Sequence, residues 1–144
     1  MTALRSDYAL IPNFIHELMR FDTAIQGLYR VVTRDTAIGE VSLKKGSKII
    51  LGFGTAGRDP DVFESPDTFD IYRKNAHKNI GFGFGPHVCV GAELAKAEVR
   101  IALETLFDRL HSIELHSSGD LSHKPSFSSR GYKRLDCVFK PISN

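Results

Sequence analysis

Apolar residues near the N-terminus repeat with the spacing of an amphipathic helix. They stand at i, i+3, i+4 and i+7, which places them on one helix face: Ile11, Phe14, Ile15 and Leu18. Pro12 suits the first turn of such a helix, because the backbone N–H that proline lacks would be unpaired there. The pattern therefore predicts a helix from Ile11 onward.

A longer apolar repeat runs through the second half of the chain. It predicts an amphipathic helix of roughly twenty residues, with charged side chains largely opposite the apolar face. The apolar face is formed by Leu94, Ala95, Val99, Ala102, Leu103, Leu106 and Leu110. The charged side chains are Glu93, Lys96, Arg100 and Asp108.

Shorter stretches have the composition or the alternation of β-strands. A strand rich in β-branched side chains is predicted around Arg30. Residues 41–43 and 48–51 flank a turn at Gly46, where glycine permits a positive φ, and so predict a strand–turn–strand unit. Residues 112–116 alternate between apolar and polar side chains, which predicts another strand.

One segment between these elements has no helical or strand period. It runs from Thr55 to Asp70, contains Pro60 and Pro66, and is rich in aspartate. Prolines and aspartates at irregular spacing favour turns over regular structure. The segment is therefore predicted to be an ordered loop.

The composition is that of one folded domain over residues 1–144. A chain of 144 residues with 42% hydrophobic content can bury a core. No apolar run approaches the roughly 20 residues of a transmembrane helix, and the N-terminus lacks the pattern of a signal peptide. A formal charge of +2, without a basic stripe that carries aromatic residues, argues against nucleic-acid binding. These features predict a cytoplasmic protein that does not bind membranes.

The chain has two cysteines, which agrees with a reducing compartment and gives no disulfide framework. Cys89 stands just before the second predicted helix. Helix N-termini carry unpaired N–H groups and a partial positive charge, which favour the thiolate, the form that binds metal. On these residues alone, a lone cysteine at a helix start is more often a buried structural thiol. Cys137 is expected to lie in the core.

The residues around Cys89 favour a ligand role. Gly85 and Gly91 permit backbone angles closed to other residues and let a flat, bulky group approach the main chain. Phe82 and Phe84 add apolar walls. Together these residues predict a tight loop that presents one thiol to a large apolar ligand.

Other motifs fit this stretch less well. A dinucleotide-binding G-x-G-x-x-G fails in both registers, because Pro86 or Val88 stands where the third glycine should be. A phosphate-binding P-loop lacks its Gly-Lys-Ser/Thr. A zinc site would need three or four ligands at short spacing, and the chain has no C-x-x-C pair.

The same residues carry a family signature. Phe82, Gly85, Cys89 and Gly91 resemble the F-x-x-G-x-x-x-C-x-G pattern of the cytochrome P450 haem-thiolate enzymes of the bacterial type. The resemblance implies that Cys89 is the axial ligand of the haem iron, a ligation that favours O–O cleavage. It also implies that His87 hydrogen-bonds a haem propionate.

Glu17 and Arg20, one turn apart on the first predicted helix, resemble the E-x-x-R pair of the K helix in that family. Arg73 matches the arginine that completes the family's Glu–Arg–Arg network. The resemblance implies that these three charges are buried and act in folding. By itself, a Glu–Arg pair at i, i+3 would be a solvated ion pair of small energy.

The resemblance gives roles to cations elsewhere. Arg30 corresponds to a second haem-propionate contact, for which the alternative is a surface arginine on a strand. Lys96 and Arg100 lie on the helix whose cationic face docks an electron donor in the family. A simple solvated face explains these two side chains equally well.

The resemblance extends from the family's K helix through the haem-cysteine loop to the C-terminus. It implies an α+β fold: K helix, small β-sheet, meander loop, cysteine loop, L helix and a C-terminal β-hairpin around 130–135. The segment from Thr55 to Asp70 would be the meander.

For function, the resemblance implies haem b as cofactor and oxidation of a small organic substrate with O₂. Electrons would come from a ferredoxin or flavoprotein partner. Because only the C-terminal part of the family pattern is present, we expect a truncated chain that is inactive alone or needs an N-terminal complementing chain, as in a split enzyme. The alternative is a non-catalytic haem-binding or interaction module.

Overall fold

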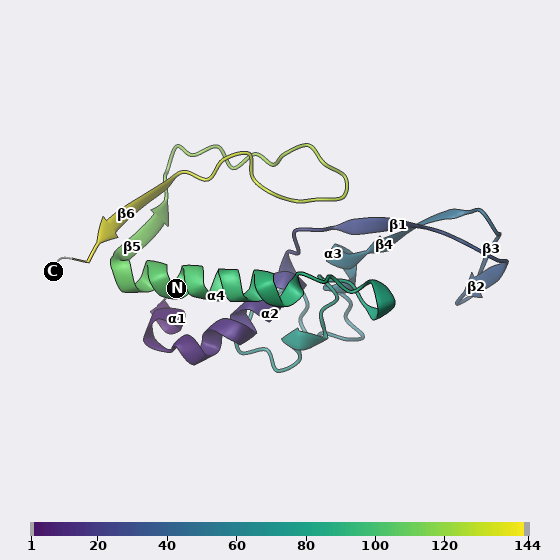
Figure 1. Ribbon diagram of the computed structural model, residues 1–144, viewed down its shortest axis with the longest axis horizontal. Helices are drawn as coiled ribbons and strands as arrows, with labels where there is room; N and C mark the ends of the chain where they lie inside the picture. The colour runs from purple at the N-terminus through teal and green to yellow at the C-terminus, as the bar shows by residue number, and fades with distance from the viewer. Residues whose placement is uncertain (1, 143–144) are drawn as a thin grey trace.

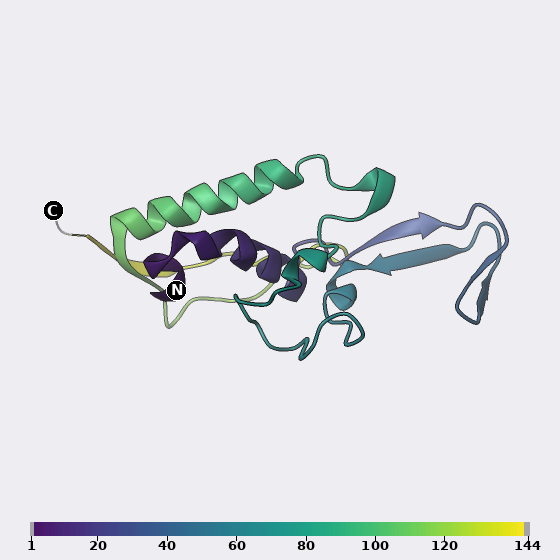
Figure 2. The ribbon, with the colours of Figure 1, turned by 90° about the horizontal axis from the view of Figure 1, so that it is seen from below.

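Two helices lie side by side at the centre of the molecule (Figures 1 and 2). In this computed structural model, which describes residues 2–142, they are α2 (Ile11–Phe21) and α4 (Ala92–Arg109). A short helix α1 (Thr2–Ser6) and a 3-10 turn η1 (Tyr8–Leu10) precede α2 and contact the C-terminal end of α4. The helix predicted from Ile11 is confirmed.

The core between these helices is small, and the side chain of Arg5 lies at its edge. Leu4, Ile11, Ile15 and Phe107 form one buried cluster, and fully burying such a side chain stabilises the fold by about 1.5–3 kcal/mol. Arg5 donates to the carbonyl oxygens of Phe107 at 2.7 Å and of residue 110 at 2.6 Å. The last carbonyls of a helix have no partner within it, so a positive side chain there satisfies them and suits the helix dipole.

The face of α4 that packs agrees with the predicted one only in part. Val99, Leu103 and Phe107, spaced four residues apart, turn toward α1 and α2, whereas Leu94 is 65% exposed. Five positions separate Leu94 from Val99, which at 3.6 residues per turn is about 140° around the helix. Leu94 therefore stands outside the packed stripe, and Phe107, which the predicted face omitted, is its most buried member.

Three separate antiparallel pairs of strands surround the helices. The first pair joins β1 (Gly27–Val31) to β4 (Lys48–Gly52), with the first residue of β1 opposite the last of β4. The second joins β2 (Thr36–Ile38) to β3 (Val41–Leu43) and extends away from the helices (Figure 2). The third joins β5 (Leu110–Leu115) to β6 (Cys137–Pro141) beyond the end of α4.

The strand–turn–strand prediction is correct for the strands and wrong for their pairing. Residues 41–43 and 48–51 are strands, but each has an earlier segment as its partner. Gly46 does adopt the expected left-handed conformation, with φ +87°. Its N–H donates to the carbonyl of Val32 at 2.7 Å, and the N–H of Val32 donates to Ser47 at 2.9 Å. The turn therefore closes back on the strand around Arg30.

The remaining segments are ordered loops. A single-turn helix α3 (Phe53–Ala56), which the sequence did not predict, follows β4. From residue 57 to 75 the described chain holds turns and bends without helix or strand. The loop predicted over 55–70 is therefore confirmed except at residues 55 and 56, which belong to α3. Two 3-10 turns follow: η2 (Ala76–Lys78) and η3 (Gly85–His87).

The C-terminal hairpin is irregular. One isolated bridge joins His123 to Tyr132, and the loop runs back along the molecule to the segment that follows α2 (Figure 1). There the N–H of Gln26 donates to Ser128 at 2.8 Å, and the N–H of Arg130 donates to the carbonyl of residue 24 at 2.7 Å. The loop ends at Cys137, which is exposed. The prediction that this cysteine lies in the core is wrong, because β6 forms a two-stranded sheet with β5 in the described chain and leaves Cys137 exposed.

Among the residues that the structure describes, no helix combines the length and the apolar character needed to cross a membrane. The cytoplasmic location stays a prediction.

Candidate functional site

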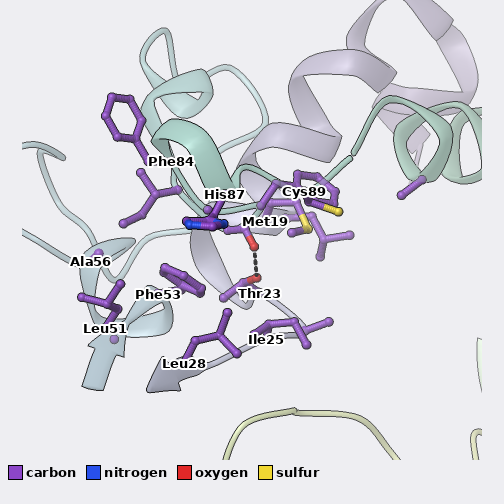
Figure 3. Close-up of a pocket in the computed structure, with 18 of the residues that line it drawn as sticks. Met19, Thr23, Ile25, Leu28, Leu51, Phe53, Ala56, Phe84, His87 and Cys89 are labelled. Carbon is purple, nitrogen blue, oxygen red and sulfur yellow. Dashed lines mark hydrogen bonds between the residues drawn. The ribbon is translucent and has the colours of Figure 1, made fainter. Parts of the chain in front are cut away.

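A cavity of about 990 Å³ opens between α2, the β1–β4 pair and the loop that leads to α4 (Figure 3). Its wall is mostly apolar, formed by Ile15, Leu18, Met19, Ile25, Leu28, Ile50, Leu51, Phe53, Ile80, Phe82, Phe84 and Val99. Leu18, which belongs to the predicted helix face, is 37% exposed and turns to this cavity. The apolar face of α2 thus serves both the core and the cavity.

Cys89 lines this cavity from the loop side (Figure 3). Its N–H donates to the carbonyl of Phe82 at 2.8 Å, which closes residues 82–89 into a loop, and its carbonyl accepts from Ala92 at 3.2 Å at the start of α4. The thiol is exposed and forms no disulfide. The alternative of a buried structural thiol is therefore wrong.

Two glycines shape this loop. Gly85 has φ +73°, in the left-handed region that favours glycine, and begins η3. Gly83, which the sequence reasoning did not single out, has φ +82° and lines the cavity wall. Both bends are needed to bring Cys89 back beside Phe82.

The expectation for Gly91 is wrong in part. Its φ is −88°, which any residue adopts, and it caps α4 without special backbone geometry. A Cβ added there would lie 3.9 Å from the Cys89 sulfur, an ordinary contact. Gly85 and Gly91 also lie outside the set of residues that line the cavity. Gly91 is therefore placed next to the thiol without a conformational demand for glycine.

The other predicted cofactor contacts reach the same cavity from two sides. Phe82 and His87 line it from the cysteine loop, and Arg30 lines it from β1. Arg30 is half-buried, and its guanidinium donates to the carbonyl of Tyr29 at 2.9 Å. Lys96 of α4 stands over the ring of Phe82, with 5.9 Å from its ammonium nitrogen to the ring centroid. The structure thus brings a thiol, an imidazole and a guanidinium to one apolar cavity.

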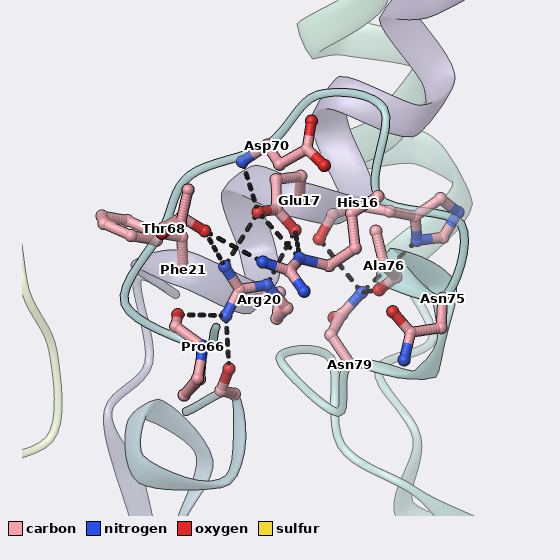
Figure 4. Close-up of polar contacts among 12 residues, drawn as sticks. His16, Glu17, Arg20, Phe21, Pro66, Thr68, Asp70, Asn75, Ala76 and Asn79 are labelled. Carbon is pink, nitrogen blue, oxygen red and sulfur yellow. Dashed lines mark hydrogen bonds and ion pairs between the residues drawn. The ribbon is translucent and has the colours of Figure 1, made fainter. Parts of the chain in front are cut away.

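Beside the cavity, Glu17 and Arg20 lie together in a buried cluster (Figure 4). Arg73 belongs to the same cluster. Arg20 donates to both carboxylate oxygens of Glu17, at 2.7 and 2.8 Å. Arg73 donates to the same carboxylate at 3.2 Å. Backbone carbonyls accept the remaining Arg20 donors: Gly57 at 2.7 Å, Pro66 at 2.8 Å and Thr68 at 3.0 Å. Every N–H of the Arg20 guanidinium therefore has a partner.

The carboxylate of Glu17 stays ionised in this cluster. Burial raises its pKa, but hydrogen bonds from Arg20, from the backbone N–H of Asp70 and from Arg73 outweigh burial, so the pKa lies below its ordinary value. A carboxylate held this way has no proton to exchange near neutral pH. The cluster is suited to tie α2 to the loop at 57–73.

Sequence reasoning missed two asparagines that tie α2 to the loops. Asn13 donates to the carbonyls of Ile71 at 2.7 Å and Arg73 at 3.2 Å. Asn79 donates to the carbonyls of Ala76 at 2.7 Å and His16 at 3.2 Å. Their partners are backbone oxygens, which leave no pattern in the sequence.

Gly57 was also missed. A Cβ added at this position would collide with the backbone carbonyl of Arg20, so the loop can approach α2 only where there is no side chain. Next to it, Arg58 donates to the carbonyl of Phe21 at 2.8 Å and lies over that residue's ring, 3.7 Å from its centroid. The end of α2 is thus enclosed by the start of the meander.

Comparison with known proteins agrees with this arrangement. The family model described as Cytochrome P450 matches residues 2–130. The chain belongs to the cytochrome P450 family. Members of this family bind haem b. The P450 signature around Cys89 and the K-helix pair Glu17 and Arg20 both lie within the matched region.

Individual P450s match over almost the entire chain. A putative cytochrome P450 140 of Mycobacterium tuberculosis is 36% identical over 141 residues, which cover 98% of this chain and 32% of that protein. A steroid C26-monooxygenase of Mycolicibacterium smegmatis is 34% identical, over 96% of this chain and 34% of its own length. The substrate-free cytochrome P450 CYP150A6 of Mycobacterium marinum superposes with a TM-score of 0.94 at 31% identity, over 99% of this chain and 37% of that one.

These matches confirm the α+β fold as the C-terminal part of the P450 fold. In P450 terms, α2 is the K helix, α4 the L helix and the loop predicted over 55–70 the meander. The chain spans about a third of the length of the relatives it matches. Whether residues 1–144 form a domain by themselves stays a prediction.

Proposed function

We propose that this chain forms the cysteine side of a haem-thiolate site, with Cys89 as the ligand of the haem iron. The observation that carries the proposal is the position of Cys89 on the wall of the large apolar cavity. Of the two cysteines, Cys89 lines that cavity and Cys137 does not. Within the described residues, no group of three or more His, Cys, Asp or Glu side chains is arranged to hold a metal ion.

The residues of the cavity fit haem b. A largely apolar wall suits a porphyrin ring, and the two predicted propionate contacts, Arg30 and His87, line the same cavity. Arg30 offers a fixed fork of N–H donors suited to a carboxylate. The bound haem would supply the binding and activation of O₂ that the protein side chains cannot perform.

The chain's own residues have defined tasks in this proposal. Cys89 binds iron as a thiolate, with its backbone held by Phe82. The ring of Phe82 excludes water from the thiol side of the cavity. Gly85 supplies a left-handed bend in the loop, Gly91 stands next to the thiol, and the cluster of Glu17, Arg20 and Arg73 holds the K helix to the meander.

Monooxygenase activity is proposed for the complete P450 assembly to which these residues contribute. There, one O₂ oxygen would be inserted into a small organic substrate, with electrons from a ferredoxin or flavoprotein. Lys96 and Arg100 of α4 are candidates for contact with that donor. Controlled proton delivery and exclusion of water on the far side of the haem require residues beyond those that line this cavity. We therefore expect no coupled oxidation from residues 1–144 without an N-terminal complementing chain.

A non-catalytic haem-binding or interaction module is the second candidate. Phe84 is 86% exposed at the tip of the cysteine loop, and Val88 and Leu94 are also exposed nearby. Apolar side chains gathered at a loop favour contact with another protein surface. This candidate retains haem binding through Cys89 and differs only in the absence of turnover.

An absorption spectrum tests the haem proposal. The purified chain is loaded with haem, reduced and treated with carbon monoxide, and we expect the red-shifted carbonyl band of thiolate-bound haem. Cys89→Ala should abolish this band, and Cys137→Ala should keep it. The opposite result for the two variants, or a band that survives Cys89→Ala, contradicts the assignment.

A further inference from the structure

The side chain of Asn79 connects the K helix to the start of the cysteine loop (Figure 4). Its amide nitrogen donates to the carbonyl of Ala76 at 2.7 Å and lies between two acceptors of His16, the carbonyl oxygen at 3.2 Å and the ring Nδ1 at 3.4 Å. Its amide oxygen accepts from the N–H of Gly81 at 3.2 Å. Carbonyl acceptors on one side and an N–H donor on the other determine the orientation of the amide.

The next residues transmit this attachment to the cysteine. Gly81 packs directly on α2, because a Cβ there would lie 2.9 Å from the Met19 side chain and 3.1 Å from its carbonyl oxygen. Thr23 donates to the carbonyl of Gly81 at 3.4 Å. Phe82 follows, and its carbonyl accepts from the N–H of Cys89 at 2.8 Å. The position of the loop 82–89 thus depends on the attachment of Asn79 to α2.

We propose that Asn79 is a positioning residue for Cys89: its amide fixes the cysteine loop to α2 and so places the thiol on the cavity wall. Control of the thiol's position follows from the bonds above and can be measured without haem. Its consequence for iron ligation rests on the function proposed above.

The contact with His16 adds a measurable signature. Because the Asn79 amide donates to Nδ1, this contact needs a neutral ring with its proton on Nε2. The charged groups around the ring are Lys96, Arg100 and Glu93 of α4 and His77 of η2. Burial lowers the pKa of His16, and Lys96 and His77 lower it further, which favours the neutral ring. Protonation of His16 would place an N–H at Nδ1 opposite the N–H of the Asn79 amide. This contact would then be lost and the attachment weakened.

The test measures amide hydrogen exchange by NMR in the haem-free chain, with Cys137→Ser in every sample. Asn79→Ala should lower the protection of the Gly81 and Cys89 N–H groups about tenfold, as expected for loss of a hydrogen-bonded side chain. Iodoacetamide should also alkylate Cys89 faster. Asn75→Ala is the matched control, since Asn75 lies in the same segment and its side-chain amide donates to the carbonyl of Val62 at 2.8 Å; it should change protection less than twofold. Equal protection of Cys89 in Asn79→Ala and Asn75→Ala overturns the proposal.

Asn79→Asp decides the question even where Asn79→Ala fails to fold. The carboxylate of this variant still accepts a hydrogen bond from the N–H of Gly81. It also favours the protonated ring of His16, which can donate to it. Protection of the Cys89 N–H, corrected for the intrinsic exchange rate, should therefore rise as pH falls through the His16 titration, whereas it falls in the parent chain. The same direction in both chains overturns the proposal. With haem, Asn79→Ala should lower the thiolate carbonyl band; a band that survives Cys89→Ala refutes the haem function and leaves the exchange result to decide the role of Asn79.

Discussion

The cluster around Glu17 and the loop around Cys89 differ in how completely this chain surrounds them. Glu17 and Arg20 are fully buried, and every donor of Arg20 has a partner within the chain. Cys89 is exposed, and its loop is closed by one backbone bond to Phe82. The cluster around Glu17 is therefore surrounded by groups of this chain, whereas Cys89 is left exposed.

The largest expected effect comes from breaking the scaffold. Glu17→Gln should cost about 3–5 kcal/mol, because it leaves the Arg20 and Arg73 guanidinium groups buried without their counter-charge. A domain has roughly 5–15 kcal/mol in total, so the variant should lose a large part of its stability and unfold at a much lower urea concentration. Urea unfolding followed by circular dichroism measures this, with Glu114→Gln on the exposed face of β5 as the control. Equal unfolding midpoints for the two variants would refute a structural role for the cluster.

A smaller loss is expected where the meander approaches α2. Gly57→Asn places a side chain against the Arg20 carbonyl and should cost about 1–3 kcal/mol, the usual range for overpacking. Gly131→Asn is the matched control, because nothing lies within 4 Å of a Cβ at that glycine. Thermal unfolding of both variants should separate them. If Gly57→Asn and Gly131→Asn have the same unfolding temperature, the loop does not approach α2 this closely in solution.

The smallest effect is a pH dependence of stability that comes from His16, where α2 meets the segment before the cysteine loop. The pKa of His16 is lowered by burial, and by Lys96 and His77, so the unfolded chain binds a proton at a higher pH than the folded chain does. Stability should therefore decrease as pH falls below the ordinary histidine value of about 6.5. His16→Gln should reduce this slope, and His111→Gln, at an exposed site, should not. A parent chain whose stability rises on acidification in this range would contradict the sign.

Some contacts could be predicted because they follow from short spacing. Glu17 and Arg20 lie one helical turn apart, so their pairing is local. Cys89 precedes an amphipathic helix and follows glycines, so its place at a helix start was visible in the order of residues. In contrast, Asn13 donates to the carbonyls of Ile71 and Arg73, and Asn79 donates to the carbonyl of His16, all far away in sequence. A backbone carbonyl belongs to every residue, so no side-chain pattern marks such a partner.

The sequence by itself determined the helices α2 and α4, the positive φ at Gly46, the loop over 57–70 and the family signature around Cys89. These depend on backbone preference and on side chains close in sequence. Tertiary structure alone decided the strand partners of 41–43 and 48–51, the exposure of Leu94 and Cys137, and the attachment of the loop by Asn79. The reason is that the burial of a side chain and the pairing of a strand depend on which distant segment packs against them. That choice is set by the packing of the entire chain, which hydrophobic spacing within one element does not encode.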